Sequence, residues 1–230
     1  MLKGNEAQEG NAKILRVAID GPSGAGKSTV AKKVAEELGI DYIDTGAMYR
    51  AVGYKMKQNG IAVIDAEKIL KMIEHTDIDF EDGKIYLDGI DVSDKIRTEE
   101  ISKAASACAR LQPVREKLVE IQRRIGHRKS VVMDGRDIGT NVFPDAQAKF
   151  YVDAAPEERA KRRFLELREK GEEVNFEDVL EDVRKRDEND MTRELDPLRK
   201  ADDAVLIDTT DMTVDEVVRE ILSSVKNKKA

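Results

Sequence analysis

The segment 21–28 has the residue types and the spacing of a phosphate-binding loop. It reads Gly-Pro-Ser-Gly-Ala-Gly-Lys-Ser, directly follows the short apolar run 14–19 and directly precedes an amphipathic helical pattern. Because glycine adopts backbone angles that are closed to other residues, successive N–H groups can point at an oligophosphate on the N-terminus of the next helix. The expected contacts to the phosphate donor are Gly21, Pro22, Ser23, Gly24, Ala25, Gly26, Lys27, Ser28 and Thr29.

Two side chains of this loop carry the expected chemistry. Lys27 supplies a mobile cation to the β- and γ-phosphates, and Ser28 supplies a hydroxyl ligand to Mg²⁺. The alternative is an ordinary glycine-rich turn that binds nothing. The unbroken succession of strand, loop, Lys-Ser pair and helix argues against that alternative.

Composition restricts the rest of the molecule. A chain of 230 residues with 40% hydrophobic residues can bury one sizeable core and leaves room for a small subdomain. The polar segment 1–13 lacks the apolar stretch of a secretory signal, and no later apolar run approaches the ~20 residues of a membrane span. We therefore expect a cytoplasmic enzyme with a disordered tail over 1–13 and no membrane partner.

Charge and residue counts exclude several other functions. A net charge of −7 argues against nonspecific binding to nucleic acid. The single cysteine, Cys108, cannot form an internal disulfide. The two histidines, His75 and His127, have no clustered cysteines, which argues against a structural zinc site and against a Ser-His-Asp triad.

Short apolar runs alternate with helical patterns along the chain, which predicts an α/β fold with a parallel sheet. The five expected strands are 17–19, 42–43, 131–133, 150–152 and 205–207. Each is followed at once by an aspartate, namely Asp20, Asp44, Asp134, Asp153 and Asp208. Ligands bind at the carboxyl edge of such sheets. We expect a simple turn or cap role for Asp153 and Asp208, whereas the other three adjoin glycine-bearing loops and are site candidates.

The segment 73–97 changes to alternating polar and apolar residues. Asp82-Gly83 and Asp88-Gly89 are strong turn signals between half-buried strands. This segment is therefore predicted to be a small antiparallel insert. Helical periodicity resumes from residue 98.

Arginines cluster in the helical segment 156–173. Arg159, Arg162 and Arg163 share one face of the predicted helix, which Gly171 ends. The next helix begins at an Asn175 cap and carries a stripe of Val179, Val183, Arg186, Asp190 and Arg193. Periodicity alone leaves two alternatives for the charged end of this stripe, an interior cleft or a solvated charged face.

Several motifs in one order resemble bacterial cytidylate kinases, which are P-loop nucleoside monophosphate kinases. They are 20–29 (DGPSGAGKST), 44–50 (DTGAMYR), 134–140 (DGRDIGT), 142–145 (VFPD) and 186–190 (RDEND) followed by Arg193. The resemblance runs from about Val17 to the C-terminal helix. The loop 21–28 alone would admit many kinases and GTPases, whereas this string of motifs is highly specific.

The resemblance implies a three-layer P-loop kinase fold with a five-stranded parallel sheet. The core would comprise 14–72, 98–155 and 174–230, with 73–97 as the antiparallel part of a monophosphate-binding insert and 156–173 as a helical lid. The implied reaction transfers the γ-phosphoryl group of ATP to CMP or dCMP, giving ADP and CDP or dCDP, with Mg²⁺ as the cofactor. We expect the chain to work as a monomer with small-molecule nucleotides as its partners.

The resemblance also implies which residues bind the acceptor. Arg50, Arg136 and Arg193 would hold its phosphate, and Arg186 with Asp190 would reach its sugar hydroxyls. Cytosine offers an amino donor and ring acceptors, so a carboxylate, a guanidinium and a hydroxyl are a sensible set to read it. The residues implied for this reading are Ser106, Arg115 and Asp137, and those implied to line the site beside them are Thr45 and Tyr49.

Two assignments stay open at this point. Arg159 and Arg163 would swing in from the lid to neutralise charge on the moving phosphoryl group, and the neighbouring Arg162 competes for that role. Asp134 is either a water-mediated Mg²⁺ carboxylate or a residue that orients an arginine. The sequence does not separate these two roles.

Other function classes fit the sequence less well. A GTPase needs a guanine-reading N-K-x-D segment, which the chain lacks. A noncatalytic ATP-binding module would not need the acceptor set of Arg50, Arg136 and Arg193. The nearest rival is a small-molecule kinase with another acceptor, such as shikimate or AMP.

Overall fold

The computed structural model describes residues 14–81 and 83–227. The predicted tail over 1–13 lies outside the described residues, as does Asp82 of the first expected turn. No helix within these two ranges combines the length and the apolar character that crossing a membrane requires.

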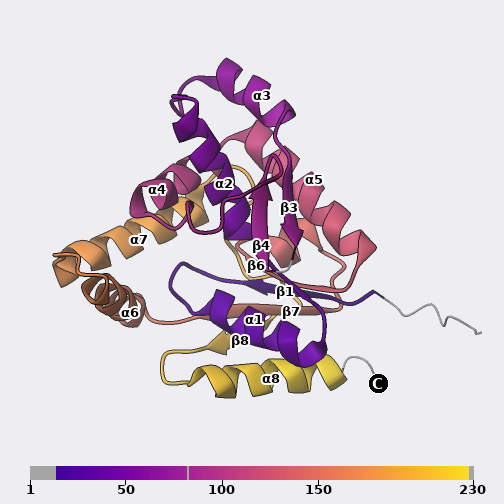
Figure 1. Ribbon diagram of the computed structural model, residues 1–230. Coiled ribbons are helices and arrows are strands. Elements are labelled where there is room, and N and C mark those ends of the chain that lie inside the picture. Colours follow the sequence, from indigo (N-terminus) through magenta and orange to yellow (C-terminus); the bar gives the residue numbers. More distant parts are fainter. Residues whose placement is uncertain (1–13, 82, 228–230) are drawn as a thin grey trace, which may run out of the picture.

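A parallel sheet of five strands forms the centre of the molecule (Figure 1). The strands are β1 (Arg16–Asp20), β2 (Asp41–Asp44), β6 (Val131–Gly135), β7 (Ala148–Asp153) and β8 (Val205–Asp208). Their order is β2-β6-β1-β7-β8, and every neighbouring pair is parallel. All five strands expected from the apolar runs are therefore confirmed, and β1 lies at the middle with its carboxyl end between β6 and β7.

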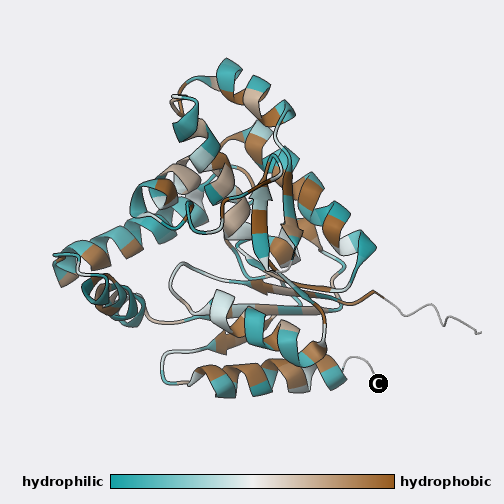
Figure 2. Ribbon diagram, viewed as in Figure 1, coloured by the Kyte–Doolittle hydropathy of each residue, from teal (hydrophilic) through white to brown (hydrophobic). Residues whose placement is uncertain are grey.

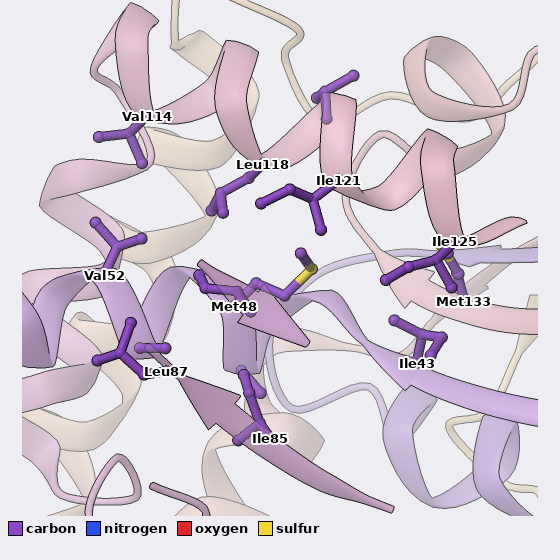
Figure 3. Close-up of a cluster of buried hydrophobic side chains, with 14 of the residues drawn as sticks. Ile43, Met48, Val52, Ile85, Leu87, Val114, Leu118, Ile121, Ile125 and Met133 are labelled. Carbon is purple, nitrogen blue, oxygen red and sulfur yellow. The ribbon is translucent and has the colours of Figure 1, made fainter. Parts of the chain in front are cut away.

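Helices cover both faces of the sheet. On one face α1 (Lys27–Leu38) and α8 (Val214–Asn227) bury their valines, isoleucines and alanines against β1, β7 and β8. On the other face lie α2 (Thr45–Gln58) and α5 (Gln112–Arg128), packed against β2 and β6. Figure 2 shows the apolar colour along the strands and on one side of α8. In Figure 3, Met48 and Val52 of α2 lie opposite Leu118 and Ile121 of α5.

The antiparallel insert is present as a second, three-stranded sheet. Its strands are β3 (Ile78–Glu81), β4 (Lys84–Leu87) and β5 (Ile90–Asp91), in the order β3-β4-β5. Asp88 and Gly89 both have positive φ, 51° and 78°, as a tight two-residue hairpin turn requires. The alternation begins later than residue 73, because Ile73 still belongs to α3 (Ala66–Glu74) and is buried on its apolar face.

The helix α4 (Glu99–Cys108) packs closely on α2. A Cβ added at Gly53 of α2 would lie 3.1 Å from Cβ of Ala104 and from the backbone N of Ala105. The absence of a side chain at Gly53 thus sets the distance between the two helices. Sγ of Cys108, the last residue of α4, lies 3.6 Å from the carbonyl oxygen of Tyr49 of α2.

Two mainly hydrophilic helices, α6 (Pro156–Glu169) and α7 (Phe176–Thr192), project from the carboxyl side of the sheet (Figures 1 and 2). Gly171 has φ 79° in the turn after α6, and Oδ1 of Asn175 accepts from the backbone N of Glu177 at 3.0 Å, so the predicted end and cap are confirmed. The two helices share a small apolar cluster that includes Leu167 and Val179.

Candidate active site

The loop between β1 and α1 has the backbone of a phosphate cradle. Gly21 has φ 147°, and a Cβ there would lie 1.9 Å from the carbonyl oxygen of Val152, so only glycine fits. Gly26, the residue before α1, has φ 84°, and no side chain caps the N–H groups of the first turn. Those N–H groups and the positive end of the helix dipole are the features that bind an anion at a helix N-terminus.

Lys27 lies at this helix start and is buried. Its Nζ donates to the carbonyl oxygen of Pro22 at 2.6 Å. Burial, followed by the positive charge of Arg136, lowers the pKa of Lys27 to about 7. An anion in the loop would favour the charged lysine, because an opposite charge at short range raises the pKa of an amine.

Asp134, at the end of β6, faces the loop from the adjacent strand. Its Oδ2 accepts from Ser28 Oγ at 2.9 Å and its Oδ1 accepts from the hydroxyl of Tyr42 at 2.8 Å. Burial, followed by the charge of Asp44, raises the pKa of Asp134 to about 6. Both of its described hydrogen-bond donors are therefore hydroxyl groups.

The donor set at this point fits Mg²⁺ held together with phosphates. Ser28 and Asp134 offer a hydroxyl and a carboxylate, the oxygen ligands that Mg²⁺ takes when phosphates and water complete its octahedron. Within 14–81 and 83–227, no three His, Cys, Asp or Glu side chains gather into a metal site.

The aspartates after β1 and β2 hold the backbone and an arginine. Asp20 accepts from the backbone N of Ile138 at 2.8 Å and of Gly139 at 2.7 Å, which fixes the start of the π-helical turn η1 (Ile138–Val142). Burial raises the pKa of Asp20 to about 7, although these two donors oppose the rise. Asp44 caps α2 through Ala47 and pairs with Arg50 at 2.7 Å.

The aspartates after β7 and β8 have the local roles expected of them. Asp153 accepts from the next backbone N–H at 2.8 Å. Asp208 accepts from the backbone N of Thr210 at 3.0 Å and from its hydroxyl at 2.6 Å. Both carboxylates therefore turn the chain.

Arginines from α2, the β6 end and α7 converge near Lys27. Arg136 donates from Nε to Asp190 at 2.7 Å, and Nε of Arg50 is buried without an acceptor among the described residues. Burial, followed by the charge of Arg136, lowers the pKa of Arg186 to about 10, and Arg50 and Arg163 add to the repulsion. Such a set of mutually repelling cations is stabilised by an anionic ligand.

The charged end of the α7 stripe faces the interior of the molecule. Arg193 donates from Nη2 to Asp137 at 3.0 Å, and Asp190 pairs with Arg136, so the stripe meets the segment 134–137. Of the two alternatives that periodicity left open, the structure supports an interior position over a solvated charged face.

A second polar group surrounds Asp137, which is buried. It accepts from Nη2 of Arg115 at 2.6 Å, from Arg193 at 3.0 Å and from Nδ2 of Asn141 at 3.1 Å. Nη1 of Arg115 also donates to the hydroxyl of Tyr49 at 3.3 Å. The predicted residues Tyr49, Arg115, Asp137 and Arg193 thus lie in one network.

Two further predicted residues lie on α4 and at the start of α2. Ser106 is half-buried on α4, and Sγ of Cys108 on the same helix lies 3.6 Å from the carbonyl oxygen of Tyr49. The hydroxyl of Thr45 is buried and donates to the carbonyl oxygen of Asp134 at 2.7 Å. Thr45 therefore connects the start of α2 to β6 in this structure.

The contacts of Arg159 differ from the expectation that this residue swings in from the lid. Arg159 is 3% exposed and donates to both oxygens of Asp187, at 3.0 and 2.6 Å, to Ala154 O at 2.8 Å and to Ser23 O at 3.0 Å. It is a fixed link between the phosphate loop, α6 and α7, and it cannot swing without breaking these bonds. Arg162 donates to Thr209 O, whereas Arg163 is half-buried and pairs only with Glu166 at 3.2 Å in this structure.

Sequence reasoning missed four contributors to the site. One is Tyr42, which the apolar run 42–43 marks only as a strand residue, and another is Asp187, which appears only within the motif 186–190. The position of Asp187 four residues after Val183 on the buried stripe was a signal for its burial. Asn141 and Asp196 carried no signal beyond polarity and a turn-forming Asp-Pro pair.

The sheet order, the glycine loop and the cation cluster together define a kinase of the P-loop class. The chain belongs to the cytidylate kinase family, whose sequence model matches residues 17–227. It is 52% identical over 211 residues to the cytidylate kinase of Clostridioides difficile strain 630, which covers 92% of this chain and 98% of that protein.

Two other relatives extend these comparisons. The chain is 49% identical over 220 residues to the cytidylate kinase of Bacillus subtilis strain 168, which covers 94% of this chain and 98% of that protein. Among solved structures, an uncharacterized protein from Eubacterium ventriosum has a TM-score of 0.52 at 16% identity, covering 94% of this chain and 99% of that chain. This last likeness shows the fold alone.

Proposed function

We propose that this protein transfers the γ-phosphoryl group of ATP to CMP or dCMP. Membership of the cytidylate kinase family and the names of relatives near 50% identity support this reaction. The structural observation that carries it is the position of Arg136. This arginine pairs with Asp190 of α7 at 2.7 Å and lies close enough to Lys27 for its charge to lower the pKa of that lysine, so the donor loop adjoins the proposed acceptor residues.

The proposed site has two sets of positively charged groups, one for the donor phosphates and one for the acceptor phosphate. Lys27 and the N-terminus of α1 face the donor phosphates. Arg50, Arg136 and Arg193 would bind the acceptor phosphate, each of them being held by a carboxylate or a carbonyl group of the chain. Phosphoryl transfer depends mainly on positioning and on positive charge around the equatorial oxygens, which this arrangement would supply.

Mg²⁺ would add charge neutralisation on the donor phosphates when bound, with Ser28 and the water-mediated Asp134 as its protein partners. Of the lid arginines, Arg163 is the better candidate for contact with the moving phosphoryl group. Its single ion pair, with Glu166 on its own helix, is easily exchanged. Arg159 would need its bonds to Asp187 to open before it could contact substrate.

The acceptor nucleoside would lie between α2, α4, α5 and α7. Arg186 and Asp190 would reach the sugar hydroxyls, and Thr45 and Tyr49 would line the site. Asp137, Arg115 and Ser106 would read the base. Cytosine presents an amino donor beside a ring acceptor, whereas uracil presents a carbonyl acceptor beside an N–H donor. An ionised Asp137 beside a guanidinium matches cytosine and opposes uracil.

A coupled assay over CMP, dCMP, UMP, AMP and shikimate tests this proposal. An unpaired or opposed polar group costs on the order of 2–3 kcal/mol, so the wild type should prefer CMP over UMP by about two decades in kcat/KM. A preference for AMP or shikimate, or equal use of CMP and UMP, would overturn the proposed acceptor.

Two variants separate base recognition from phosphate recognition. Asp137→Asn offers an amide that can donate to the uracil carbonyl group, so the CMP over UMP ratio should narrow, chiefly through loss of CMP activity. Arg136→Ala should weaken both acceptors to the same extent, because the phosphate is common to them. An unchanged ratio in Asp137→Asn would refute the assignment of Asp137.

We also propose that the chain works as a monomer in the cytoplasm. Light scattering coupled to size-exclusion chromatography, with and without nucleotides, measures the oligomeric state. A dimer as the main species would refute the monomer.

A further inference from the structure

Asp196, in the turn after α7, contacts the candidate base-reading group from outside. Its Oδ2 accepts from Nε of Arg115 at 3.1 Å and from Nη2 at 3.0 Å. Nη2 of the same guanidinium donates to Asp137 at 2.6 Å. Arg115 is 3% exposed in its side chain and is therefore shared between a buried carboxylate on one side and the 35% exposed Asp196 on the other.

The backbone of Asp196 is held as firmly as its side chain. Its φ is 46°, in the left-handed region that aspartate adopts at a cost. Its carbonyl oxygen accepts from Nε of Arg193 at 2.7 Å, and Nη2 of Arg193 donates both to this oxygen and to Asp137. Asp196 thus closes a ring in which Arg115 and Arg193 flank Asp137.

Space exists for Arg115 to move if this contact is lost. Arg115 and Asp196 line an open hollow of about 590 Å³, together with Asn141 and Leu195. The remaining acceptors of Arg115 other than Asp137 are neutral, namely the hydroxyl of Tyr49 at 3.3 Å and the carbonyl oxygen of Ala109 at 3.4 Å. The carboxylate of Asp196 is the charged contact that holds the outer side of the guanidinium.

We propose that Asp196 is a positioning residue for base selectivity. It fixes Arg115 beside Asp137, so that the base meets a carboxylate acceptor and a guanidinium donor in fixed positions. This proposal rests on the proposed reading of the base by Asp137 and Arg115. A fixed order matches the amino group and N3 of cytosine and opposes the carbonyl group and N3–H of uracil. A mobile Arg115 would tolerate uracil and would bind cytosine less well.

The left-handed backbone of Asp196 suggests the substitutions. Asp196→Asn and Asp196→Gly both keep a residue that tolerates positive φ, and both remove the negative charge. The chain contains a matched control in Asp88, whose φ is 51° and whose carboxylate pairs with Lys55 at 2.6 Å in the insert. Asp88→Asn makes the same chemical change at the same backbone conformation.

Steady-state kinetics with CMP and with UMP test the proposal. Loss of a charge-assisted contact should lower the CMP over UMP ratio of kcat/KM roughly tenfold in both Asp196 variants. The loss should lie in the KM for CMP, with kcat at saturating CMP nearly unchanged. Asp88→Asn should keep the wild-type ratio.

Three results would overturn the proposal. A wild-type ratio in both Asp196 variants removes any role in selectivity. An equal loss in Asp196→Asn and Asp88→Asn shows a general effect of the backbone. Asp137→Asn is measured in parallel. If its CMP over UMP ratio of kcat/KM is unchanged, both the proposed base recognition and this proposal are overturned. If the ratio changes in Asp137→Asn but not in the Asp196 variants, this proposal alone is overturned.

Discussion

Two ion pairs connect α6 to α7, and they differ chiefly in burial. Arg159 and Asp187 lie 2.6 Å apart with side-chain exposures of 3% and 11%. Glu157 and Arg184 lie 2.7 Å apart with exposures of 55% and 60%. We predict that Asp187→Ala destabilises the protein strongly and that Glu157→Ala does not.

The magnitude follows from what each substitution leaves behind. Asp187→Ala leaves a buried guanidinium without its counter-ion, which costs about 3–5 kcal/mol. Glu157→Ala leaves Arg184 in water, and exposed pairs contribute about 0.2–1 kcal/mol. For a chain of this size each kcal/mol lowers the melting temperature by about 2–4 °C, so the expected losses are about 6–20 °C and at most about 4 °C.

Thermal unfolding monitored by circular dichroism measures both losses under one buffer condition. The double variant Arg159→Met/Asp187→Leu should recover much of the stability, because an apolar pair of similar volume often replaces a buried ion pair without loss. It should still raise the KM for ATP, since the bond from Arg159 to Ser23 O in the phosphate loop is gone. Equal melting temperatures for Asp187→Ala and Glu157→Ala would refute the argument from burial.

Three other predictions concern the donor loop, the acidic residue behind it and the lid. Lys27→Met should lower turnover by on the order of a hundredfold without changing the far-UV spectrum, and near-normal turnover would refute its role. The pKa of Asp20 is about 7 in the folded protein, whereas its usual value is 3.8. Between these two pH values the folded state holds a proton that the unfolded state has released. The free energy of unfolding should therefore fall as pH rises from about 4 to 7. Asp20→Asn should flatten that slope in pH-dependent denaturant titrations, and identical slopes would contradict the cause. Spin labels at Glu81→Cys and Glu169→Cys should approach one another when both nucleotides bind, and the distance should shorten less with ATP alone. A distance distribution that is the same in all states would refute the moving lid. The buried Cys108 should not react with the label.

The architecture could be predicted from the sequence because its signals are local. Runs such as 131–133 are apolar, short and closed by an aspartate, and this pattern depends on no distant residue. The cap at Asn175 and the glycine after α6 are equally local signals. The boundary of α3 was missed by two residues, since Ile73 fits both a helical and an alternating pattern.

The pairing of charged side chains could be predicted only in part. Periodicity put Asp190 and Arg193 on one helix face but did not say what that face meets. The answer depends on Arg136 and Asp137, more than 50 residues earlier in the chain. The fixed position of Arg159 could not be predicted for the same reason. Its burial depends on contacts with Asp187 and with the carbonyl oxygen of Ser23, and the local sequence of α6 does not indicate either contact.

The fixed Arg159 connects the loop between β1 and α1 to α7. It bonds Ser23 of the donor loop and Asp187 of α7, and α7 carries Asp190, the partner of Arg136. The proposed donor loop and the residues proposed to bind the acceptor phosphate are therefore connected through protein contacts. Because in-line transfer loses rate steeply with misplacement of about 1 Å, a buried ion pair at this point serves alignment even though its net contribution to stability is small. If Arg163 contacts the moving phosphoryl group as proposed, its motion would leave these contacts of Arg159 in place.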